Sequence, residues 1–178
     1  EVLANVAAEM DELTGVFNRR GMLRRLTELF DRRSLGRHFL LLLDIDYFKH
    51  INDRYGHPAG DVLLVDLAKR LQAQLRPDDC LIRLGGEEFA VIATELNDHQ
   101  ALALGERLRR SIAEDGFMLE PLAGLPGDTQ GVKVSVPMTI SVGIASFSAP
   151  ECLGTEQSLH PEEDIRHCQA MAVAQADQ

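Results

Sequence analysis

Residues 38–44 read HFLLLLD, in which five consecutive apolar residues end at a carboxylate. The run does not alternate between apolar and polar residues, and this favours a β-strand that is covered on both faces. The β-prone residues 80–84 and 89–93 flank the sequence GGEE at 85–88, as two strands flank the turn of a β-hairpin. The fold is therefore expected to be built on a buried strand and a hairpin.

Helices are expected around these strands, because apolar residues recur there at helical spacing. The expected helices cover residues 1–10, 18–33, 59–75 and 98–114, and a loop rich in Gly and Pro at 116–131 precedes the β-prone residues 132–147. This order predicts the α/β (α+β) class, with a mixed β-sheet flanked by helices. Because no linker or repeat divides the chain, we expect a single domain.

The composition argues against two classes of function. The chain has 178 residues, of which 45% are hydrophobic, and its longest aliphatic run is far shorter than the roughly 20 apolar residues of a membrane span. Its 18 Lys and Arg against 28 Asp and Glu give a net charge of -10, which argues against nonspecific binding to nucleic acid. A polyanionic ligand must therefore be held locally, with help from a metal ion.

The cysteines and the first residue bear on location. The three cysteines share no metal-ligand spacing, and an odd number suits reduced thiols better than a disulfide framework, so we expect a cytoplasmic domain. The sequence begins with Glu1 rather than Met, which suggests a piece of a longer polypeptide. A membrane anchor upstream of Glu1 is compatible with this interpretation.

Two acidic positions stand next to the expected strands. Asp44 ends the buried strand and Glu87 lies in the hairpin turn, so the two carboxylates converge on a hard cation if these strands are neighbours. Mg²⁺ prefers such oxygen ligands and retains water and substrate phosphates. Asp46 and Glu88 are interpreted first as solvated loop acids, and the Gly-Gly pair at 85–86 first as the residues that a tight turn requires.

The segment DIDYFKHINDRYGHPAGD at residues 44–61 carries more polar groups than a simple loop needs. Lys49 offers a point charge for a phosphate, and Asn52 and Asp61 offer the amide and carboxylate edges that recognise a purine base. Taken singly, Asn52 is better explained by the end of a helix or a turn, and Asp61 by helix capping. Their joint presence favours nucleotide binding.

Four segments together resemble the GGDEF family of diguanylate cyclases. They read DELTGVFNRR at 11–20, DIDYFKHINDRYGHPAGD at 44–61, RLGGEEF at 83–89 and TISVGIA at 139–145, the third being the Glu variant, GGEEF, of the signature loop. They follow the family's order and span about residues 11–148. We therefore expect a GGDEF domain over residues 11–178, with a linker helix at 1–10 and a divergent segment at 149–178.

The resemblance implies a fold and a reaction. Members of the family have a palm-like fold related to the catalytic domains of adenylyl cyclases and polymerases, and they condense two GTP into cyclic di-GMP with release of two pyrophosphates. Two-metal catalysis fits this chemistry, because the cations activate the nucleophile and neutralise the triphosphate. One domain holds one GTP, so the active species is expected to be a homodimer with facing sites.

The matching positions carry over the family's site residues. By this resemblance Asp44, Glu87 and the backbone carbonyl of Ile45 would bind Mg²⁺, with Mn²⁺ as an alternative ion, and Glu87 would be the catalytic residue that assists deprotonation of the ribose 3′-hydroxyl. The substrate-binding residues would be Asn52 and Asp61 at the guanine, Lys49 and the backbone around Phe48 at the phosphates, and His57 and Arg83 in supporting positions.

A second site is suggested by the sequence RPDD at 76–79, shortly before the GGEEF loop. Arg76 and Asp79 resemble the family's inhibitory product site, at which they would contact cyclic di-GMP, and Arg107 would supply an additional cation. The same segment is also expected to form a Pro-Asp turn that joins a helix to a strand.

One departure from the family leaves two functions open. The family's last helix carries a Lys and an Arg that reach the phosphates, and residues 164–178, DIRHCQAMAVAQADQ, lack that pattern. The intact GGEEF loop and Asp44 favour an active cyclase, whereas the altered end favours a catalytically inactive receptor that binds cyclic di-GMP at Arg76 and Asp79. The expected partners are GTP, cyclic di-GMP, a second copy of the chain and an upstream sensory module, without nucleic acid.

Overall fold

The structure is a computed structural model that describes residues 8–31, 37–120 and 133–148. The elements are α2 (Arg19–Asp31), β1 (Arg37–Ile45), α3 (Phe48–Tyr55), α4 (His57–Gln72), β2 (Cys80–Gly85), β3 (Glu88–Thr94), α5 (Asp98–Ala113), β4 (Phe117–Leu119), β5 (Val134–Val136) and β6 (Ile140–Ser148). The predicted α+β class is confirmed, and the main sheet follows the order of a split βαβ fold. None of the helices in the described ranges combines the length and the apolar composition needed to cross a membrane.

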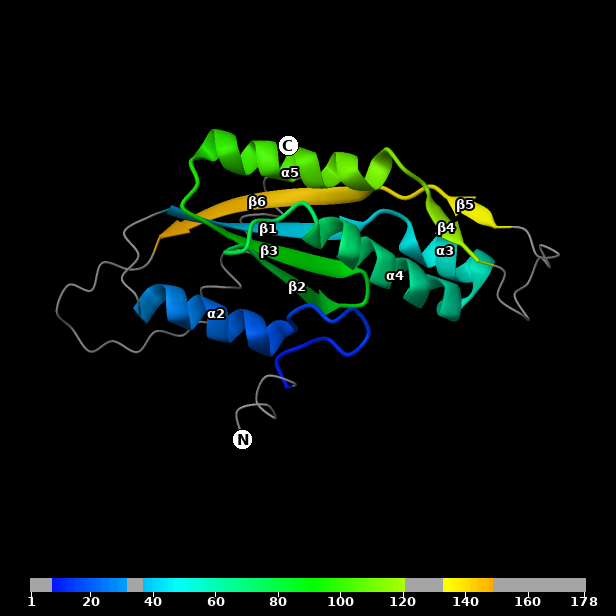
Figure 1. The fold of residues 1–178 in the computed structure, drawn as a ribbon, viewed down its shortest axis with the longest axis horizontal. Helices are drawn as coiled ribbons and strands as arrows, with labels where there is room; N and C mark the ends of the chain where they lie inside the picture. Colours follow the sequence, from blue (N-terminus) through cyan, green and yellow to red (C-terminus); the bar gives the residue numbers. More distant parts are fainter. Residues whose placement is uncertain (1–7, 32–36, 121–132, 149–178) are drawn as a thin grey trace.

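Four strands form one sheet in the order β2-β3-β1-β6, with β1 in its interior (Figure 1). β1 pairs antiparallel with β3 on one side and with β6 on the other, and β2 pairs antiparallel with β3. We expected a mixed sheet, so this detail is corrected. α3 and α4 connect β1 to β2, which run in the same direction, but the antiparallel strand β3 lies between them. In the same way, α5 connects β3 to β6, and the antiparallel strand β1 lies between those two.

Both faces of β1 are covered, which explains its unbroken apolar run. Leu41 and Leu43 pack into a core shared with α4 and α5, whereas Leu40 packs with Met22 and Leu26 of α2 in a second cluster. Figure 1 shows α2 running beside β2 and α5 running along β6. The prediction of a strand covered on both faces is therefore confirmed.

Two helices are each preceded by an Asn residue, whose side chain accepts a hydrogen bond from an N–H group in the first turn of the helix. The side-chain oxygen of Asn18 accepts from the N–H of Gly21 at 3.1 Å, just before α2 begins. Asn97 accepts from the N–H of Gln100 at 2.9 Å, and the Gln100 side chain accepts from the N–H of Asn97 at the same distance. These caps explain why α2 and α5 each begin one residue after an Asn.

Three segments differ from the sequence-based expectation. Residues 8–10 lie in a turn and in an isolated bridge between Met10 and Phe17, rather than in the helix expected over 1–10, and residues 1–7 lie outside the described part. Residues 117–119, which we assigned to a loop, form β4 and pair with β5. α3 was not predicted as a helix, because a short segment with two buried side chains shows little periodicity.

The other expected elements are confirmed with small shifts at their ends. The remainder of the expected loop at 116–131 and the divergent segment at 149–178 extend into residues that the structure does not describe.

Replacing Leu41 by Ala is expected to destabilise the fold, because Leu41 is 0% exposed at the centre of β1 and its truncation leaves a cavity. We expect a loss of about 2–5 kcal/mol in the free energy of unfolding, measured by urea denaturation. Leu102→Ala is the matched control, since Leu102 is 63% exposed on α5, and it should change stability by less than about 0.5 kcal/mol. A Leu41→Ala variant as stable as the parent chain would contradict the assignment of Leu41 to the core.

Candidate functional site

The register of the sheet brings Asp44 to the hairpin turn. Asp44 pairs with Glu88 across the β1–β3 ladder, and β2 and β3 are joined through Gly86 and Glu87. Ile45, the last residue of β1, follows Asp44 at the same end of the sheet. β1 and β3 are therefore neighbours, which is the condition on which the expected convergence of Asp44 and Glu87 rested.

The carboxylates at this end of the sheet repel one another. Partial desolvation raises the pKa of Asp44, and the negative charges of Glu88 and Asp46 raise it further. Within the described residues, the side chains of Asp44 and Glu87 have no hydrogen-bond or ion-pair partner. A cation beside Asp44 would relieve this repulsion and favour its charged form.

The donor set fits a hard divalent cation that is shared with a ligand. Carboxylate oxygens of Asp44 and Glu87, together with the backbone carbonyl of Ile45, are of the kind that Mg²⁺ prefers. In the part of the chain that the structure describes, no group of three or more His, Cys, Asp or Glu side chains is placed to hold a metal ion. The other positions around such an ion would therefore be filled by water and by substrate phosphates.

Asp46 is not the solvated loop acid that we expected, and Glu88 is exposed as expected but is the first residue of β3 rather than a loop residue. Asp46 accepts hydrogen bonds from the hydroxyls of Thr139 and Ser141, the latter at 2.7 Å, and its N–H donates to the carbonyl of Thr139 at 3.0 Å. These contacts tie the end of β1 to the start of β6. Glu88 lies opposite Asp44 and raises the pKa of Asp44, so it belongs to the acidic end of the sheet. The strand register was the signal that the sequence analysis lacked.

Arg83 holds the hairpin turn in shape. Its Nε and one terminal nitrogen donate to the backbone carbonyl of Gly86 at 3.1 and 2.8 Å, and the other terminal nitrogen donates to Asp11 at 3.1 Å. Gly85 and Gly86 have φ values of 151° and 50°, in the positive region that glycine adopts readily. The turn interpretation of the Gly-Gly pair is confirmed, and Arg83 positions the loop that carries Glu87.

Asp11 anchors Arg83 from the N-terminal segment. Burial opposes the ionisation of Asp11, but hydrogen bonds from the hydroxyl and N–H of Thr14 and from the Arg83 guanidinium bring its pKa below the ordinary value. The ion pair is largely shielded, with the Arg83 and Asp11 side chains 12% and 23% exposed. The DELTG segment is therefore part of the frame of the site.

The residues expected to bind the nucleotide base lie on α3 and α4. Asn52 on α3 has a buried Oδ1 without a hydrogen-bond partner. A Cβ atom at Gly60 would lie 2.0 Å from that oxygen, so a larger residue there would displace the Asn52 side chain. An unpaired buried amide oxygen costs free energy. It therefore favours a ligand that supplies N–H donors, as a guanine edge does.

Asp61 on α4 lines a hollow of 410 Å³ together with apolar side chains that include Leu13, Leu63 and Met118. A carboxylate beside apolar walls suits a flat base with polar edges. The helix-capping interpretation of Asp61 is wrong, because α4 begins at His57 and Asp61 lies in its second turn. Leu13 was missed as an individual residue, although it lies within the quoted DELTG motif.

The phosphate-binding candidates lie where β1 passes into α3. Phe48 is the first residue of α3 and is 4% exposed, and Lys49 after it is exposed. His57 is exposed at the start of α4. Lys49 is thus placed a few residues beyond Asp44 with its side chain accessible to a ligand.

The RPDD segment forms a tight turn between α4 and β2, which confirms the turn interpretation. The N–H of Arg76 donates to Oδ2 of Asp79 at 3.0 Å, and the N–H of Asp79 donates to the carbonyl of Arg76 at 3.1 Å. Asp79 is 7% exposed and secures the turn, whereas Arg76 is exposed. Arg76 is therefore the more accessible of the two side chains for a ligand.

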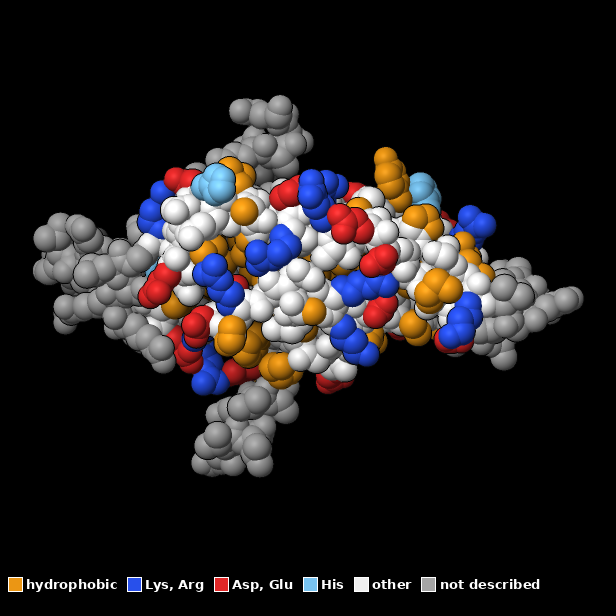
Figure 2. Space-filling view, turned by 45° about the horizontal axis from the view of Figure 1, so that its top comes forward, with side chains coloured by type: hydrophobic (Ala, Val, Ile, Leu, Met, Phe, Trp, Pro, Cys, Tyr) orange, Lys and Arg blue, Asp and Glu red, His pale blue; other side chains and the backbone are white. Residues whose placement is uncertain are grey.

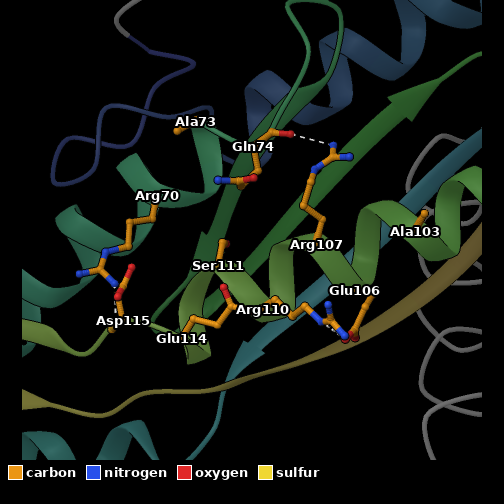
Figure 3. Close-up of a pocket in the computed structure, with 10 residues that line it drawn as sticks. All are labelled: Arg70, Ala73, Gln74, Ala103, Glu106, Arg107, Arg110, Ser111, Glu114 and Asp115. Atoms are coloured by element: carbon orange, nitrogen blue, oxygen red, sulfur yellow. Dashed lines mark hydrogen bonds and ion pairs between the residues drawn. The ribbon is translucent and has the colours of Figure 1, made fainter.

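Arg107 borders a hollow of 930 Å³ between the end of α4 and α5 (Figure 3). Its guanidinium donates to the backbone carbonyl of Gln74 at 2.9 Å, just before the RPDD turn. Arg70 and Arg110 also line the hollow, but Arg70 donates to the carbonyl of Gly116 and Arg110 is paired with Glu106. The contact of Arg107 with Gln74 brings α5 next to the segment that leads into the turn.

Charges of both signs are interspersed on the molecular surface. On the face drawn in Figure 2, Lys and Arg side chains alternate with Asp and Glu side chains. Nine ion pairs are formed by described residues, and several of them join neighbouring turns of α2 or α5. A highly charged anion would therefore be bound at a local site rather than along this face.

Comparison with known proteins identifies the family. The family model for the diguanylate cyclase, GGDEF domain, matches residues 8–165. The chain therefore belongs to the GGDEF-domain family. The resemblance carried by the four sequence motifs is confirmed.

Individual relatives agree with this assignment. The chain is 33% identical over 159 residues to the probable diguanylate cyclase DgcT of Escherichia coli (strain K12), a match that covers 89% of this chain and 31% of that protein. It resembles the crystal structure of the GGDEF domain of YfiN, also called TpbB, from Pseudomonas aeruginosa, with a TM-score of 0.69 and 30% identity over 93% of this chain and 92% of that one.

A second similar structure was solved with a ligand. The GGDEF domain of DgcB from Caulobacter crescentus, in complex with c-di-GMP, matches with a TM-score of 0.69 and 25% identity, over 94% of this chain and 89% of that chain. The chain spans only 26% to 37% of the length of the first curated relatives that it matches.

Replacing Asp44 by Asn is expected to raise the Tm of the metal-free chain at neutral pH. A carboxyl whose pKa is raised on folding above 3.8 destabilises the folded state once it is charged, and this cost disappears as the pH falls and the group becomes protonated. Thermal unfolding with a chelator should therefore show a higher Tm for Asp44→Asn at pH 7, and the difference should shrink on acidification. Glu114→Gln, at the end of α5, controls for the loss of one negative charge. A lower Tm for Asp44→Asn at pH 7 would contradict the repulsion described above.

Proposed function

We propose that the chain is a diguanylate cyclase domain, which condenses two GTP into cyclic di-GMP and releases two pyrophosphates. The observation that carries the proposal is the pairing of Asp44 with Glu88, at the base of the GGEEF hairpin that bears Glu87. Carboxylates whose repulsion raises a pKa are suited to hold a divalent cation together with a triphosphate. Membership of the family supports the reaction class.

The guanine base would be bound by α3 and α4. The buried Oδ1 of Asn52 would accept one N–H of the base edge, and the carboxylate of Asp61 would accept another. Leu13 and the apolar side chains of the same hollow would cover the ring. Specificity would arise because a base that lacks these N–H donors would leave both acceptors unpaired.

The triphosphate would lie over the end of β1 and the first turn of α3. Lys49 would supply a positive charge, and backbone N–H groups around Phe48 would donate to phosphate oxygens. Arg83 would keep the hairpin loop in place through Gly86, with His57 in a supporting position at the start of α4. When bound through Asp44, Glu87 and the carbonyl of Ile45, two Mg²⁺ or Mn²⁺ ions would neutralise the triphosphate and activate the nucleophile.

Glu87 would act as the base in the reaction. It would take the proton from the ribose 3′-hydroxyl, whose oxygen forms a bond to the α-phosphorus of the other GTP. The bond from that phosphorus to the bridging oxygen breaks, and pyrophosphate leaves with the electron pair. Two such steps close the cyclic dinucleotide.

The active unit would be a homodimer. The described part of the domain has one candidate base-binding site and one acidic sheet end, so one GTP would be bound per copy. Each 3′-oxygen can reach the α-phosphorus of the other GTP only if two copies face each other across a two-fold axis.

The chain would work as the output domain of a longer protein. We assign the domain to residues 11–178, with residues 1–10 as the link to an upstream sensory module. The curated relatives are about three times as long as their match to this chain, which leaves room for such a module in those proteins. The reaction would take place in the cytoplasm, where GTP is available, whether or not the parent protein has a membrane anchor.

Replacing Glu87 by Gln is expected to reduce cyclic di-GMP formation from GTP and Mg²⁺ by at least roughly 10²-fold, because the general base is lost. Product would be measured by chromatography, with circular dichroism as the check that the fold is retained. Glu114→Gln is the matched control and should keep the parental rate. A fully active Glu87→Gln variant would remove Glu87 from the mechanism, and a parent chain that forms no cyclic product would overturn the cyclase assignment.

A noncatalytic receptor for cyclic di-GMP is the second candidate. The observation that favours it is the exposed Arg76 on a turn that Asp79 secures, with Arg107 bonded just before that turn. In the cyclase, the same site would serve product inhibition. The similar DgcB domain was solved with c-di-GMP, which supports a ligand of this kind.

Replacing Arg76 by Ala is expected to weaken the binding of cyclic di-GMP by at least about tenfold, because charge-assisted contacts to the ligand are lost. Isothermal titration calorimetry would measure the affinity. Arg109→Ala is the control, since Arg109 is exposed on α5 and paired with Glu106. If the parent chain binds cyclic di-GMP but forms none from GTP, the receptor is selected. If the parent chain forms cyclic di-GMP and the Arg76→Ala variant is no longer inhibited by it, the cyclase with product inhibition is selected. Unchanged affinity in Arg76→Ala would exclude this site.

A further inference from the structure

Tyr47 is the most exposed of the large apolar residues in the described part of the chain, at 78%. Its backbone has φ 58° and ψ 27°, which is the left-handed region. Only Tyr47 and Glu95 among the described residues other than glycine have positive φ. An aromatic residue seldom adopts this conformation, because its Cβ atom crowds the backbone.

The neighbours of Tyr47 impose this conformation. On one side, Asp46 is held by hydrogen bonds from the hydroxyls of Thr139 and Ser141. On the other side, Phe48 is 4% exposed in the core. These two attachments restrict the backbone on both sides of Tyr47. Backbone strain that the surroundings enforce is found preferentially at functional sites.

The exposed ring is also held in place. Tyr47 stacks on His50, with ring centroids 5.8 Å apart and an angle of 7° between the planes. The backbone carbonyl of Tyr47 accepts the N–H of His50 at 2.9 Å, which joins the two residues in one turn. The result is a flat, accessible pair of rings at the start of α3. Ordered aromatic surfaces of this kind stack well on a nucleobase or pack on a sugar.

The position of the pair argues against a contact with the base bound by its own copy. That base would be bound by Asn52 and Asp61, whereas Tyr47 lies between Asp44 and Lys49 in the chain, at the end that receives phosphates. In a two-fold dimer, the α-phosphate of one GTP meets the ribose of the other. In such a dimer, a side chain next to the phosphates of one copy would lie on the side that faces the guanosine of its partner.

We propose that Tyr47, supported by His50, contacts the guanosine moiety of the GTP bound to the facing copy and so completes that copy's site. This inference rests on the proposed function and adds to it a residue that acts across the dimer axis. Removal of the ring should weaken the nucleotide-dependent dimer and leave the binding of a nucleotide to a single copy unchanged.

The test uses 3′-deoxy-GTP, which lacks the attacking hydroxyl and leaves the complex unreacted. Sedimentation with Mg²⁺ would measure dimerisation with and without this nucleotide. Tyr47→Asn removes the ring and suits the left-handed backbone, Tyr47→Phe keeps the ring, and Leu102→Asn controls for the loss of an exposed apolar side chain. We expect Tyr47→Asn to weaken dimerisation by roughly tenfold or more with the nucleotide, and to leave it unchanged without the nucleotide. Tyr47→Phe and Leu102→Asn should behave as the parent chain.

A second measurement distinguishes a weaker dimer from a distorted nucleotide site within one copy. The rate of cyclic di-GMP formation per chain should be low for Tyr47→Asn at low protein concentration and approach the parental rate when the dimer is saturated. The affinity of a dilute single copy for 3′-deoxy-GTP should match that of the parent chain. A reduced affinity in the single copy, or a rate deficit that persists at saturation, would assign Tyr47 to its own site and overturn the proposal.

The outcomes distinguish this inference from the proposed function. Parental dimerisation by Tyr47→Asn overturns the role of Tyr47, even if the parent chain makes cyclic di-GMP. A parent chain that dimerises with 3′-deoxy-GTP but forms no cyclic product overturns the cyclase assignment, and the sedimentation result for Tyr47→Asn then still decides the contact. Absence of any nucleotide-dependent dimer of the parent chain overturns the role of Tyr47.

Discussion

The antiparallel pairing of β1 with β3 is the constraint on which the rest of the site depends. Side chains of a strand alternate between faces, so a slip of one residue would turn Leu41 and Leu43 away from the core beneath α4 and α5. The same slip would move Asp44 away from Glu88. Because both faces of β1 are covered by separate apolar clusters, the core admits one register. Hydrophobic packing thereby fixes the position of a polar site that contributes little to it.

The acidic end of the sheet shows how a chain with a net charge of -10 can be suited to an anionic substrate. Asp44 and Glu88 make the local electrostatic potential more negative, and without a cation this potential would repel a triphosphate. A divalent cation reverses the sign of that potential where it is needed. The nearby Arg83 does not supply this charge, because its guanidinium is engaged by Gly86 and Asp11. Asp44 and Glu88 therefore favour a bound cation, whereas Arg83 holds the hairpin loop through the carbonyl of Gly86.

The sequence was sufficient for those features that depend on local pattern. The apolar run at 38–44 predicted a strand covered on both faces, and the GGEE turn predicted the hairpin. Features that depend on register or on distant partners were not accessible in this way. Asp46 was judged a loop acid because its partners, Thr139 and Ser141, lie far along the chain. Glu88 was set aside because only the ladder shows that it faces Asp44.

The same limit applies to the short elements. α3 has too few buried residues for its periodicity to be visible, and β4 is a strand only because β5 pairs with it. Lys49, Asn52 and Asp61 were candidates because of their polar groups, and the resemblance to a family assigned each of them a role. The structure adds the unpaired oxygen of Asn52 and the apolar neighbours of Asp61.

The ion pair between Asp11 and Arg83 has a mechanical consequence. Arg83 donates hydrogen bonds to the backbone carbonyl of Gly86 in the signature loop, and Asp11 belongs to the segment that precedes α2. A displacement of that segment would reach the loop through this ion pair and through the backbone hydrogen bonds that Phe17 forms with Leu81 and Arg83. A module fused ahead of Asp11 would therefore be connected to the signature loop by a short series of contacts.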